Sequence, residues 1–268
     1  MSGEQSVSEG GLSSVPDVAG ERYRSEQEFH DHIFEEGTRA KVSRFYDVVK
    51  DCSDRYEQQL MAMAPAGVSV LEYGCGVGTD AFALARQGAE VSAIDISEEG
   101  IRQARAQAET EGLHISCRQM NAEDLEFDAS TFDVVCGRGI IHHLDLDSAY
   151  DQLRRVLKPS GAALFMEPLG HNPVINEFRR RTPSLRTPDE HPLLLRDFDL
   201  AKTYFRRVDV TFYGLFSLLA LPVPESNFRV KLIDRLSAVD AAVLPRIGKM
   251  AKFSWFAIME LSEPREHG

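Results

Sequence analysis

The middle of the chain alternates short apolar runs with longer stretches that repeat apolar residues at helical spacing. The runs at 68–71 and 90–94 have the length of buried strands. This alternation predicts a parallel sheet with helices on both faces, a Rossmann-like, doubly wound α/β fold, across residues 68–168. The helices predicted by the spacing are 80–87, 97–111 and 147–157.

The flanking segments differ in composition from this core. Strand-like runs at 208–213 and 255–261 enclose an insertion with a helical pattern near 228–243. We therefore expect the chain to divide into five parts: a disordered tail at 1–20, an N-terminal helical cover at 21–66, a core at 67–214, a helical lid insertion at 215–252, and a final core strand with its tail at 253–268.

A glycine-rich turn follows the first predicted strand. Gly74, Gly76 and Gly78 would let backbone amides approach a ligand closely, in dihedrals that a Cβ forbids. A dinucleotide-binding turn needs the pattern Gly-x-Gly-x-x-Gly, and Thr79 stands where its third glycine should be. The turn therefore argues against NAD as the nucleotide.

Two acids flank this turn in sequence. Glu72 precedes it, where a carboxylate suits an ammonium group better than a pyrophosphate, and Asp95 ends the second strand, where a carboxylate can take both ribose hydroxyls. One carboxylate suited to an amine and another suited to a ribose match S-adenosylmethionine, which carries no phosphate.

Five motifs extend this interpretation along the core. In this chain they are LEYGCGVG (71–78), AIDIS (93–97), NAEDLEF (121–127), FDVVCGRGIIHHL (132–144) and LRRVLKPSGAALFMEP (153–168). With these motifs in this order, the chain resembles the class I S-adenosylmethionine-dependent methyltransferases, in the small-molecule, type 11-like branch. The resemblance implies a mostly parallel seven-stranded sheet with an antiparallel last strand, and N-terminal helices that cover the cofactor.

The resemblance also implies roles for residues of the cofactor site. Glu72 would bind the methionine amine, the amides around Gly74 and Gly76 its carboxylate, and Asp95 the ribose. Glu72 and Asn121 depart from the family's commoner aspartates, although the Asn121 carbonyl oxygen can accept from an adenine amino group. The other residues expected at the site are Cys75, Gly78, Ile96, Ala122, Glu123, Gly137 and Arg138. The alternative is that the acids only cap turns and helices.

Methyl transfer is an in-line displacement at a sulfonium, and a base is needed only when the acceptor must lose a proton. His142 and His143, after the fourth strand, are candidates for that base, and His171 is another. The alternative for each is a hydrogen-bonding residue in the wall of the site. His30 and His32, in the N-terminal cover, are weaker candidates near the substrate.

The run from His143 to Asp147 raises the question of a metal. His143, Asp145 and Asp147 would share one side only in an extended segment. We favour the simpler interpretation that Asp145 or Asp147 caps the helix that follows. No metal site is therefore expected.

Two sequence features bear on the acceptor. Arg179, Arg180, Arg181 and Arg186 suit recognition of a carboxylate or phosphate, or form a solvated helix end. The apolar run from 213 to 222 is compatible with a lipophilic substrate or an interfacial helix, and packing in the core or lid is its default interpretation. A lipophilic acid or a phosphorylated lipid would satisfy both features. The residues expected near the acceptor are His30, Phe34, Glu167, Arg179, Arg186 and Tyr213.

Composition narrows the class of partner. The chain has 268 residues and a formal net charge of -12, which disfavours nucleic acid as a partner. Four separated cysteines without a C-x-x-C pair indicate a reduced, cytoplasmic protein. We expect no signal peptide and no transmembrane segment, although transient contact with a membrane surface stays compatible. A monomer and a homodimer both remain open.

The leading hypothesis is a soluble enzyme that transfers a methyl group from S-adenosylmethionine to a small acceptor, lipophilic and/or anionic, most simply in natural product biosynthesis. O-methylation is favoured, with N- or C-methylation as alternatives. The second hypothesis is methylation of RNA, DNA or protein, although the chain lacks an N/D-P-P-Y motif and a basic domain. The third is a non-catalytic scaffold that has kept the fold.

Overall fold

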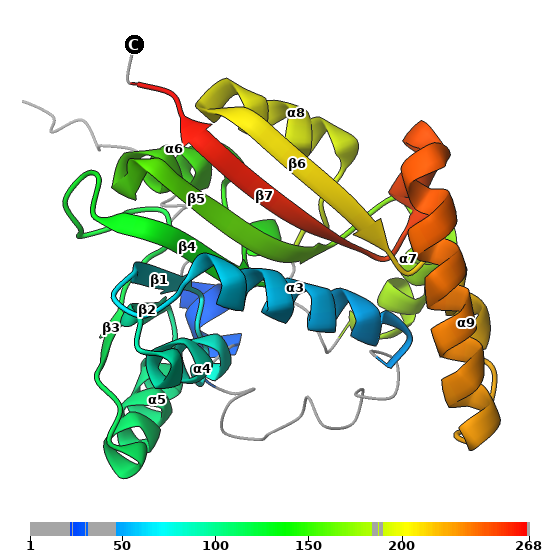
Figure 1. Ribbon diagram of the computed structural model, residues 1–268, viewed down its shortest axis with the longest axis horizontal. Helices are drawn as coiled ribbons and strands as arrows, with labels where there is room; N and C mark the ends of the chain where they lie inside the picture. Colours follow the sequence, from blue (N-terminus) through cyan, green and yellow to red (C-terminus); the bar gives the residue numbers. More distant parts are fainter. Residues whose placement is uncertain are drawn as a thin grey trace, which may run out of the picture.

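A computed structural model describes residues 22, 24–29, 31, 47–183, 187 and 190–266 of the chain. In this part of the chain, seven strands form one sheet in the order β3-β2-β1-β4-β5-β7-β6 (Figure 1). The strands are β1 (Ser69–Tyr73), β2 (Glu90–Asp95), β3 (Ile115–Gln119), β4 (Phe132–Arg138), β5 (Leu157–Pro168), β6 (Phe205–Tyr213) and β7 (Phe256–Pro264).

The pairing of the strands confirms the predicted fold class. β1 pairs in parallel with β2 and with β4, β2 with β3, and β4 with β5. β7 is antiparallel to both β5 and β6, and it lies between them although it comes last in the chain. The sheet is thus mostly parallel with an antiparallel last strand.

Helices follow the strands as the apolar spacing predicts. The three core helices are α4, α5 and α6, and each lies within one residue of its predicted bounds. Residues 24–29 are also helical. The α-helices after that segment are α3 (Lys50–Met63), α4 (Thr79–Gln87), α5 (Glu98–Glu111), α6 (Leu146–Val156), α7 (Pro173–Arg181), α8 (Leu195–Tyr204) and α9 (Asn227–Val243). The 3-10 helices are η2 (Asp47–Val49), η3 (Ile141–His143), η5 (Ser217–Ala220), η6 (Leu244–Arg246) and η7 (Gly248–Phe253).

The two faces of the sheet bury two separate apolar clusters, because successive strand residues point to opposite faces. Val134 belongs to the cluster under α3, α4 and α5, and its neighbour Val135 to the cluster under α6 and α8. Tyr56 of α3 and Tyr150 of α6 are fully buried, one in each cluster. Because helices cover both faces of the sheet, the strand sequences are apolar runs rather than alternating patterns.

The insertion between β6 and β7 packs beyond the end of these two strands, at the right of Figure 1. Its anchor is Asp240 of α9, a buried carboxylate that accepts backbone N–H bonds from Leu215, Phe216 and Ser217. The apolar run that begins at Leu215 is therefore a loop and η5 held by a helix. The ion pair of Arg229 with Asp47, at 2.8 Å, joins α9 to η2. Its predicted role as a lid stays a prediction.

Among the helices of the described residues, none is both long and apolar enough to cross a bilayer.

Candidate cofactor and acceptor site

The carboxyl ends of β1, β2, β3 and β4 meet at one edge of the sheet, and they bring the predicted cofactor residues together. The chain crosses from one side of the sheet to the other between β1 and β4, which are neighbours. Doubly wound sheets bind ligands at such a switch point, outside the carboxyl ends of the strands. The topology thus creates the site that the motifs predict.

The turn from β1 into α4 depends on glycine. Gly74, Gly76 and Gly78 have φ values of 70°, 52° and 88°, in the left-handed region. A Cβ on Gly74 would lie 2.7 Å from side-chain atoms of Ile140, so the turn has no room for one. The N–H of Cys75 donates to the carbonyl of Ile94 at 2.8 Å and fixes the turn to the end of β2.

Glu72 lies buried beneath this turn. Its two carboxylate oxygens accept the backbone N–H groups of Asp80, at 3.3 Å, and Ala81, at 2.9 Å, in the first turn of α4. Burial, and then the charge of Asp80, raise the pKa of Glu72 above its usual range. Two carboxylate oxygens can accept about four hydrogen bonds, so Glu72 retains capacity for an ammonium group. A cation beside it would stabilise its ionised form.

Asp95 fastens two loops at the end of β2. Its Oδ2 accepts the N–H of Gly76 at 2.6 Å, and its Oδ1 accepts the N–H of Ser97 at 2.9 Å. Each oxygen keeps a lone pair, which is what two ribose hydroxyls require. Ile96, next in the chain, is half-buried beside it.

The loop after β3 is shaped by its own polar groups. The Asn121 side-chain oxygen accepts the N–H of Glu123 at 2.9 Å. The carbonyl of Ala122 accepts a hydrogen bond from the hydroxyl of Tyr73, a residue of β1 that is fully buried. This bond holds the predicted adenine loop against the strand that carries Glu72.

The N-terminal segment lies against these same loops. Arg22 forms an ion pair with Glu123, and Asp31 accepts a hydrogen bond from the Ser97 hydroxyl. Glu26, which comes between these two residues in the sequence, is buried, and its Oε2 lies 3.4 Å from Nδ1 of His143. These contacts place the described residues of the segment beside the cofactor loops, and its role as a cover stays a prediction.

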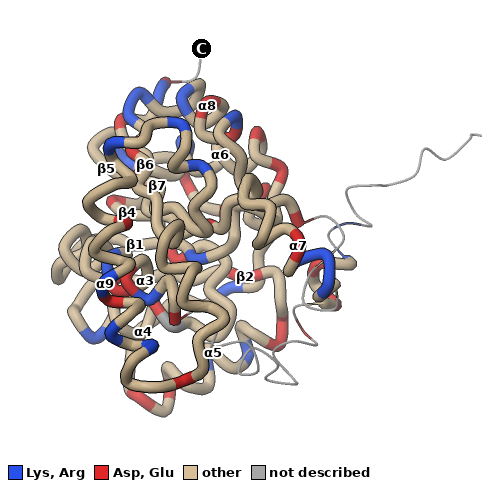
Figure 2. The backbone as a smooth tube through the Cα atoms, turned by 90° about the vertical axis from the view of Figure 1, so that its right-hand side faces the viewer, with Lys and Arg blue, Asp and Glu red and all other residues tan. Residues whose placement is uncertain are grey.

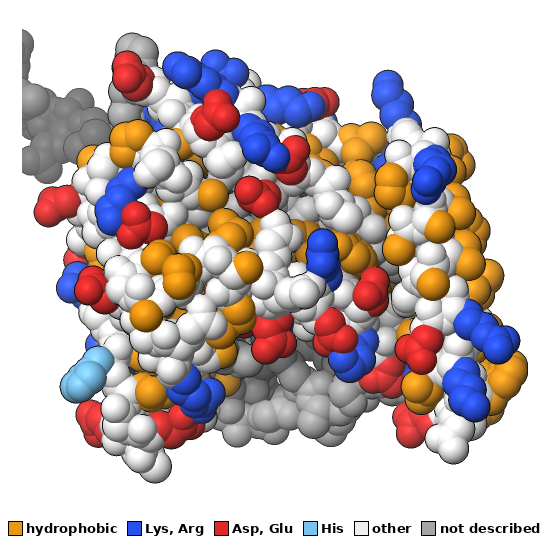
Figure 3. Space-filling view, viewed as in Figure 1, with side chains coloured by type: hydrophobic (Ala, Val, Ile, Leu, Met, Phe, Trp, Pro, Cys, Tyr) orange, Lys and Arg blue, Asp and Glu red, His pale blue; other side chains and the backbone are white. Residues whose placement is uncertain are grey.

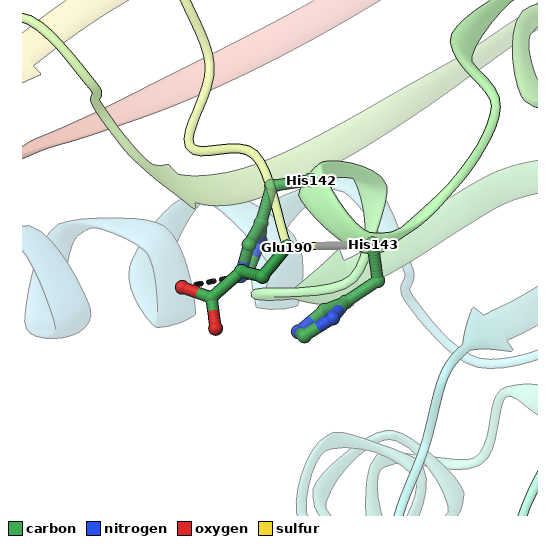
Figure 4. A group of neighbouring side chains, drawn as sticks. All are labelled: His142, His143 and Glu190. Carbon is green, nitrogen blue, oxygen red and sulfur yellow. Dashed lines mark ion pairs between the residues drawn. The ribbon is translucent and has the colours of Figure 1, made fainter. Parts of the chain in front are cut away.

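A group of histidines and carboxylates adjoins the cofactor loops at the ends of β4 and β5 (Figure 4). Nδ1 of His142 lies 2.7 Å from Oε2 of Glu167. The other oxygen of Glu167 accepts the N–H groups of Ile140 and Ile141, each at 3.0 Å. Glu167 is fully buried, and this burial raises its pKa to about 7. The predicted acceptor residue Glu167 thus orients the ring of His142.

Glu190 joins this group from the connection between α7 and α8. The N–H of His191 donates to the carbonyl of His142 at 3.0 Å, and a bridge of Leu169 with Leu193 holds the connection against the end of β5. Oε1 of Glu190 consequently lies 3.8 Å from Nε2 of His142. Figure 4 shows the carboxylate next to both imidazoles.

Comparison with known proteins agrees with this geometry. A family model described as a methyltransferase domain matches residues 70–161, which run from β1 into β5. That segment is similar to the methyltransferase domain family. The glycine turn without room for a Cβ, and the two acids with spare acceptor capacity, fit S-adenosylmethionine, the methyl donor of the class that the chain resembles.

Individual relatives support the same assignment. A ubiquinone biosynthesis O-methyltransferase of Xanthomonas axonopodis pv. citri is 32% identical over 121 residues, which are 45% of this chain and 51% of that protein. The chain thus spans about half the length of these curated relatives. The activity and acceptor of those whole proteins are therefore not carried over to this chain by the match.

Solved structures show the same fold. The YcgJ protein of Bacillus subtilis aligns with a TM-score of 0.53 at 21% identity, over 80% of this chain and all of that one. Geranyl diphosphate C-methyltransferase of Streptomyces coelicolor A3(2) aligns with a TM-score of 0.55 at 13% identity, over 79% of each chain. At this identity the likeness concerns the fold of the methyltransferase domain alone.

Arg138 joins three elements of the described residues, and its predicted contact with the cofactor stays a prediction. Its guanidinium forms a forked ion pair with Asp80, at 2.8 to 3.1 Å, and donates to the Ser53 hydroxyl at 2.7 Å. It also stacks over the ring of Tyr56 at 4.4 Å. Gly137, its neighbour, has no room for a Cβ, which would lie 2.7 Å from the carbonyl of Tyr73.

His171 and Tyr213 lie in less suggestive surroundings. Nε2 of His171 accepts the N–H of Leu195 at 3.1 Å, and burial lowers the pKa of the imidazole. A lone pair already engaged by the backbone is poorly suited to take a proton from an acceptor. Tyr213 ends β6 half-buried, and burial raises its pKa to about 12.

Figure 2 shows a stretch of basic residues in α7, and these arginines form contacts within the protein. Arg180 and Arg181 both pair with Glu177 on the same exposed helix, and Arg179 donates to the carbonyl of Leu169 at 2.8 Å. This favours the simpler alternative, a solvated helix end. His30, His32, Phe34 and Arg186 lie outside the described residues.

The caps of the helices follow the predicted pattern. Asp145 is the N-cap of α6, and its Oδ1 accepts the N–H of Ser148 at 2.9 Å. The preferred interpretation of the run from His143 to Asp147 is therefore confirmed.

Four residues that contact the candidate site were not singled out from the sequence. Tyr73 lies within the motif at 71–78 without a predicted role, and Glu26, Asp80 and Glu190 are brought to the site by contacts of the fold.

Proposed function

We propose that the protein transfers a methyl group from S-adenosylmethionine to the oxygen of a small acceptor. The observation that carries this proposal is the pair of carboxylates, Glu72 and Asp95, placed on either side of a glycine turn at the switch point of the sheet. Their spacing and spare acceptor capacity support an ammonium site and a ribose site in one ligand. The family match of residues 70–161 supports the same ligand.

In this proposal each cofactor residue holds one part of the ligand. Glu72 binds the methionine ammonium, Asp95 the ribose hydroxyls, and the Asn121–Glu123 loop the edge of the adenine. When bound, S-adenosylmethionine supplies a methyl group on a sulfonium, which a nucleophile displaces in line. The residues of the site orient the acceptor and exclude water. These two effects supply most of the acceleration in such a reaction.

Two findings favour oxygen as the methylated atom. An acceptor hydroxyl must lose its proton, and the group of His142, His143, Glu167 and Glu190 offers imidazoles and carboxylates at the end of β4. Curated relatives of the matched segment are named as O-methyltransferases. N-methylation and C-methylation are the alternatives, and analysis of the product distinguishes them.

The acceptor itself is proposed as small and lipophilic. Large apolar side chains of the insertion are exposed, among them Phe228 at 67% and Val230 at 56%. Figure 3 shows apolar side chains along α9, at the right of that view. Because the arginines of α7 already have partners, an anionic group on the acceptor is a weaker part of the proposal. A cytoplasmic location, and a monomer or a homodimer, stay predictions.

The decisive experiment is calorimetric titration of the protein with S-adenosylmethionine and S-adenosylhomocysteine. We expect micromolar binding that Asp95→Ala weakens at least 100-fold. The matched control is Asp209→Ala, on the exposed side of β6, which should leave the affinity unchanged. A folded protein that binds neither compound would favour the scaffold hypothesis. A binding protein is then screened for S-adenosylhomocysteine formation with phenols, lipophilic acids, amines and RNA.

A further inference from the structure

We propose that His142, His143 and Glu190 bind one divalent cation of the first transition series at the edge of the acceptor site. The three residues each offer a ligand atom, and these atoms lie within 4.8 Å of one another. Two imidazoles and one carboxylate form a ligand set typical of zinc, iron(II) or manganese(II) rather than of calcium. Nothing in the sequence pattern suggested this group, and it departs from the expectation of no metal.

The distances suit a common ion. Zinc lies about 2.0–2.2 Å from nitrogen and carboxylate oxygen, so two ligands in a tetrahedral site lie roughly 3.4 Å apart. Nε2 of His142 and Oε1 of Glu190 are 3.8 Å apart. A displacement of Oε1 of Glu190 by about 0.4 Å would bring the two atoms to that separation. Glu190 belongs to a connection rather than to a helix or strand, so the backbone can follow.

The surroundings of His142 resemble those of a metal ligand. A ligating imidazole usually donates its other ring N–H to a carboxylate, which fixes the tautomer and aims the free nitrogen. Glu167 takes this place, 2.7 Å from Nδ1 of His142, and is itself fixed by two backbone N–H groups. Nε2 is consequently the nitrogen that faces Glu190. A merely structural histidine does not need a fully buried carboxylate behind it.

His143 has a comparable neighbour. Its Nδ1 lies 3.4 Å from Oε2 of Glu26 and 3.4 Å from the hydroxyl oxygen of Thr187. The rings of His142 and His143 lie 4.2 Å apart between centroids, tilted by 40°. Two imidazoles at this separation repel each other when both are protonated, whereas a shared cation would hold them together.

The charge of the group also favours a cation. Three carboxylates surround the two imidazoles, and the side chains of Glu26, Glu167 and Glu190 are only 8%, 0% and 10% exposed. Collecting buried carboxylates costs free energy unless positive charge accompanies them. Protonated imidazoles are the other source of that charge, and they are the alternative that the experiment below separates.

The chemical use of the cation rests on the proposed function. An acceptor hydroxyl bound to the metal loses its proton to solvent at a lower pH, because the cation stabilises the oxyanion. That oxygen then forms a bond to the methyl carbon as the carbon–sulfur bond breaks, and the electron pair of that bond leaves with sulfur as a neutral thioether. The acceptor class is thereby narrowed to compounds with an ionisable hydroxyl, such as phenols.

The test uses the full chain after treatment with a chelator. Co²⁺ is added and its visible absorption followed, and Zn²⁺, Mn²⁺ and Mg²⁺ are titrated by calorimetry. We expect one Co²⁺ per chain, with an absorption intensity typical of low coordination number. His142→Gln, His143→Gln and Glu190→Gln should each weaken binding at least tenfold, and Glu167→Gln about 10-fold or more through the orientation of His142. The matched control, His114→Gln, replaces an exposed histidine elsewhere and should have no effect.

Two results would overturn the proposal: no saturable binding of any of these cations, or binding that the three variants leave intact. Circular dichroism confirms that each variant is folded, and Glu190→Gln, in a connection, is the least disruptive. S-adenosylhomocysteine is titrated into the same samples without metal. A chain that binds this compound and no cation refutes the metal site alone, whereas one that binds a cation and not the compound refutes the proposed function.

Discussion

The ion pair between Arg138 and Asp80 should carry much of the stability of the cofactor half of the fold. It joins the end of β4 to the start of α4, and Arg138 also contacts Ser53 and Tyr56 of α3. The side chain of Asp80 is only 5% exposed. Replacement of Arg138 by methionine keeps most of the aliphatic volume and removes the charge. The change therefore leaves a buried carboxylate without its partner.

The expected loss can be worked out from these contacts. Breaking a buried ion pair by removing one partner costs about 3–5 kcal/mol, and the 28% exposure of Arg138 places this pair near the lower limit. Loss of the stacking on Tyr56 adds roughly 1 kcal/mol. Arg138→Met should thus lower the free energy of unfolding by about 4 kcal/mol. In a chain of this size that corresponds to a fall in melting temperature of about 10 °C.

The loss should also depend on pH. Burial and the charge of Asp80 raise the pKa of Glu72, and Arg138 opposes this effect. Without Arg138 the folded-state pKa of Glu72 rises further above its unfolded value. When folding raises the pKa of a carboxyl group, the resulting contribution to stability is fully present below the pKa of the unfolded state, near 4.5. This contribution is lost as the pH rises through the pKa of the folded state. Arg138→Met should therefore cost more at pH 8 than at pH 5.

Urea denaturation followed by fluorescence measures this directly, because Trp255 is the only tryptophan of the chain and is buried. The matched control is Arg102→Met, which removes an exposed arginine paired with Glu99 and should leave the midpoint unchanged. A loss below 1 kcal/mol at pH 8, or a loss equal at both pH values, would refute the account of this pair.

Three further outcomes are expected. Gly74→Ala should weaken S-adenosylmethionine binding at least tenfold, since its Cβ would meet Ile140, whereas Gly112→Ala, which has a similar φ and open space, should leave binding unchanged. Calorimetry near pH 7 in buffers of different ionisation enthalpy should show that binding of S-adenosylmethionine releases a proton, because its ammonium group lowers the raised pKa of Glu72. Glu72→Gln should abolish that release. Asp240→Ala should lower the melting temperature by several degrees, since three backbone N–H groups lose a buried acceptor, and an unchanged melting curve would contradict that role.

The architecture of the core was predictable because its rules are local. Strands buried on both faces give short apolar runs, and helices between them repeat apolar residues at their own period. The caps are equally local: Asp145 lies three residues from the N–H that it accepts. Glu72 and Asp95 were predictable at the site because a strand end fixes where a side chain is placed.

The polar contacts within the site were not predictable, because they join residues distant in sequence. Arg138 and Asp80 are 58 positions apart, and only the fold brings them together. Glu190 lies beside His142 because the backbone N–H of the next residue, His191, donates to the carbonyl of His142. No sequence spacing predicts that contact. The partners of two α7 arginines are local, since Glu177 lies within a turn of Arg180 and Arg181 and pairs with both. A contact of these arginines with an anionic acceptor stays a prediction.

The position of β7 has a consequence for how the chain is made. Among the described residues β6 pairs with β7 alone, and the far edge of β5 is likewise covered by β7. Until β7 has left the ribosome and paired, both strands have unpaired edges, which are natural templates for association with other chains. The nascent protein is therefore most vulnerable to aggregation between the emergence of β6 and the docking of β7. Loss of residues 256–264 alone would leave β5 and β6 with two open edges, and the chain would keep every other strand of the sheet.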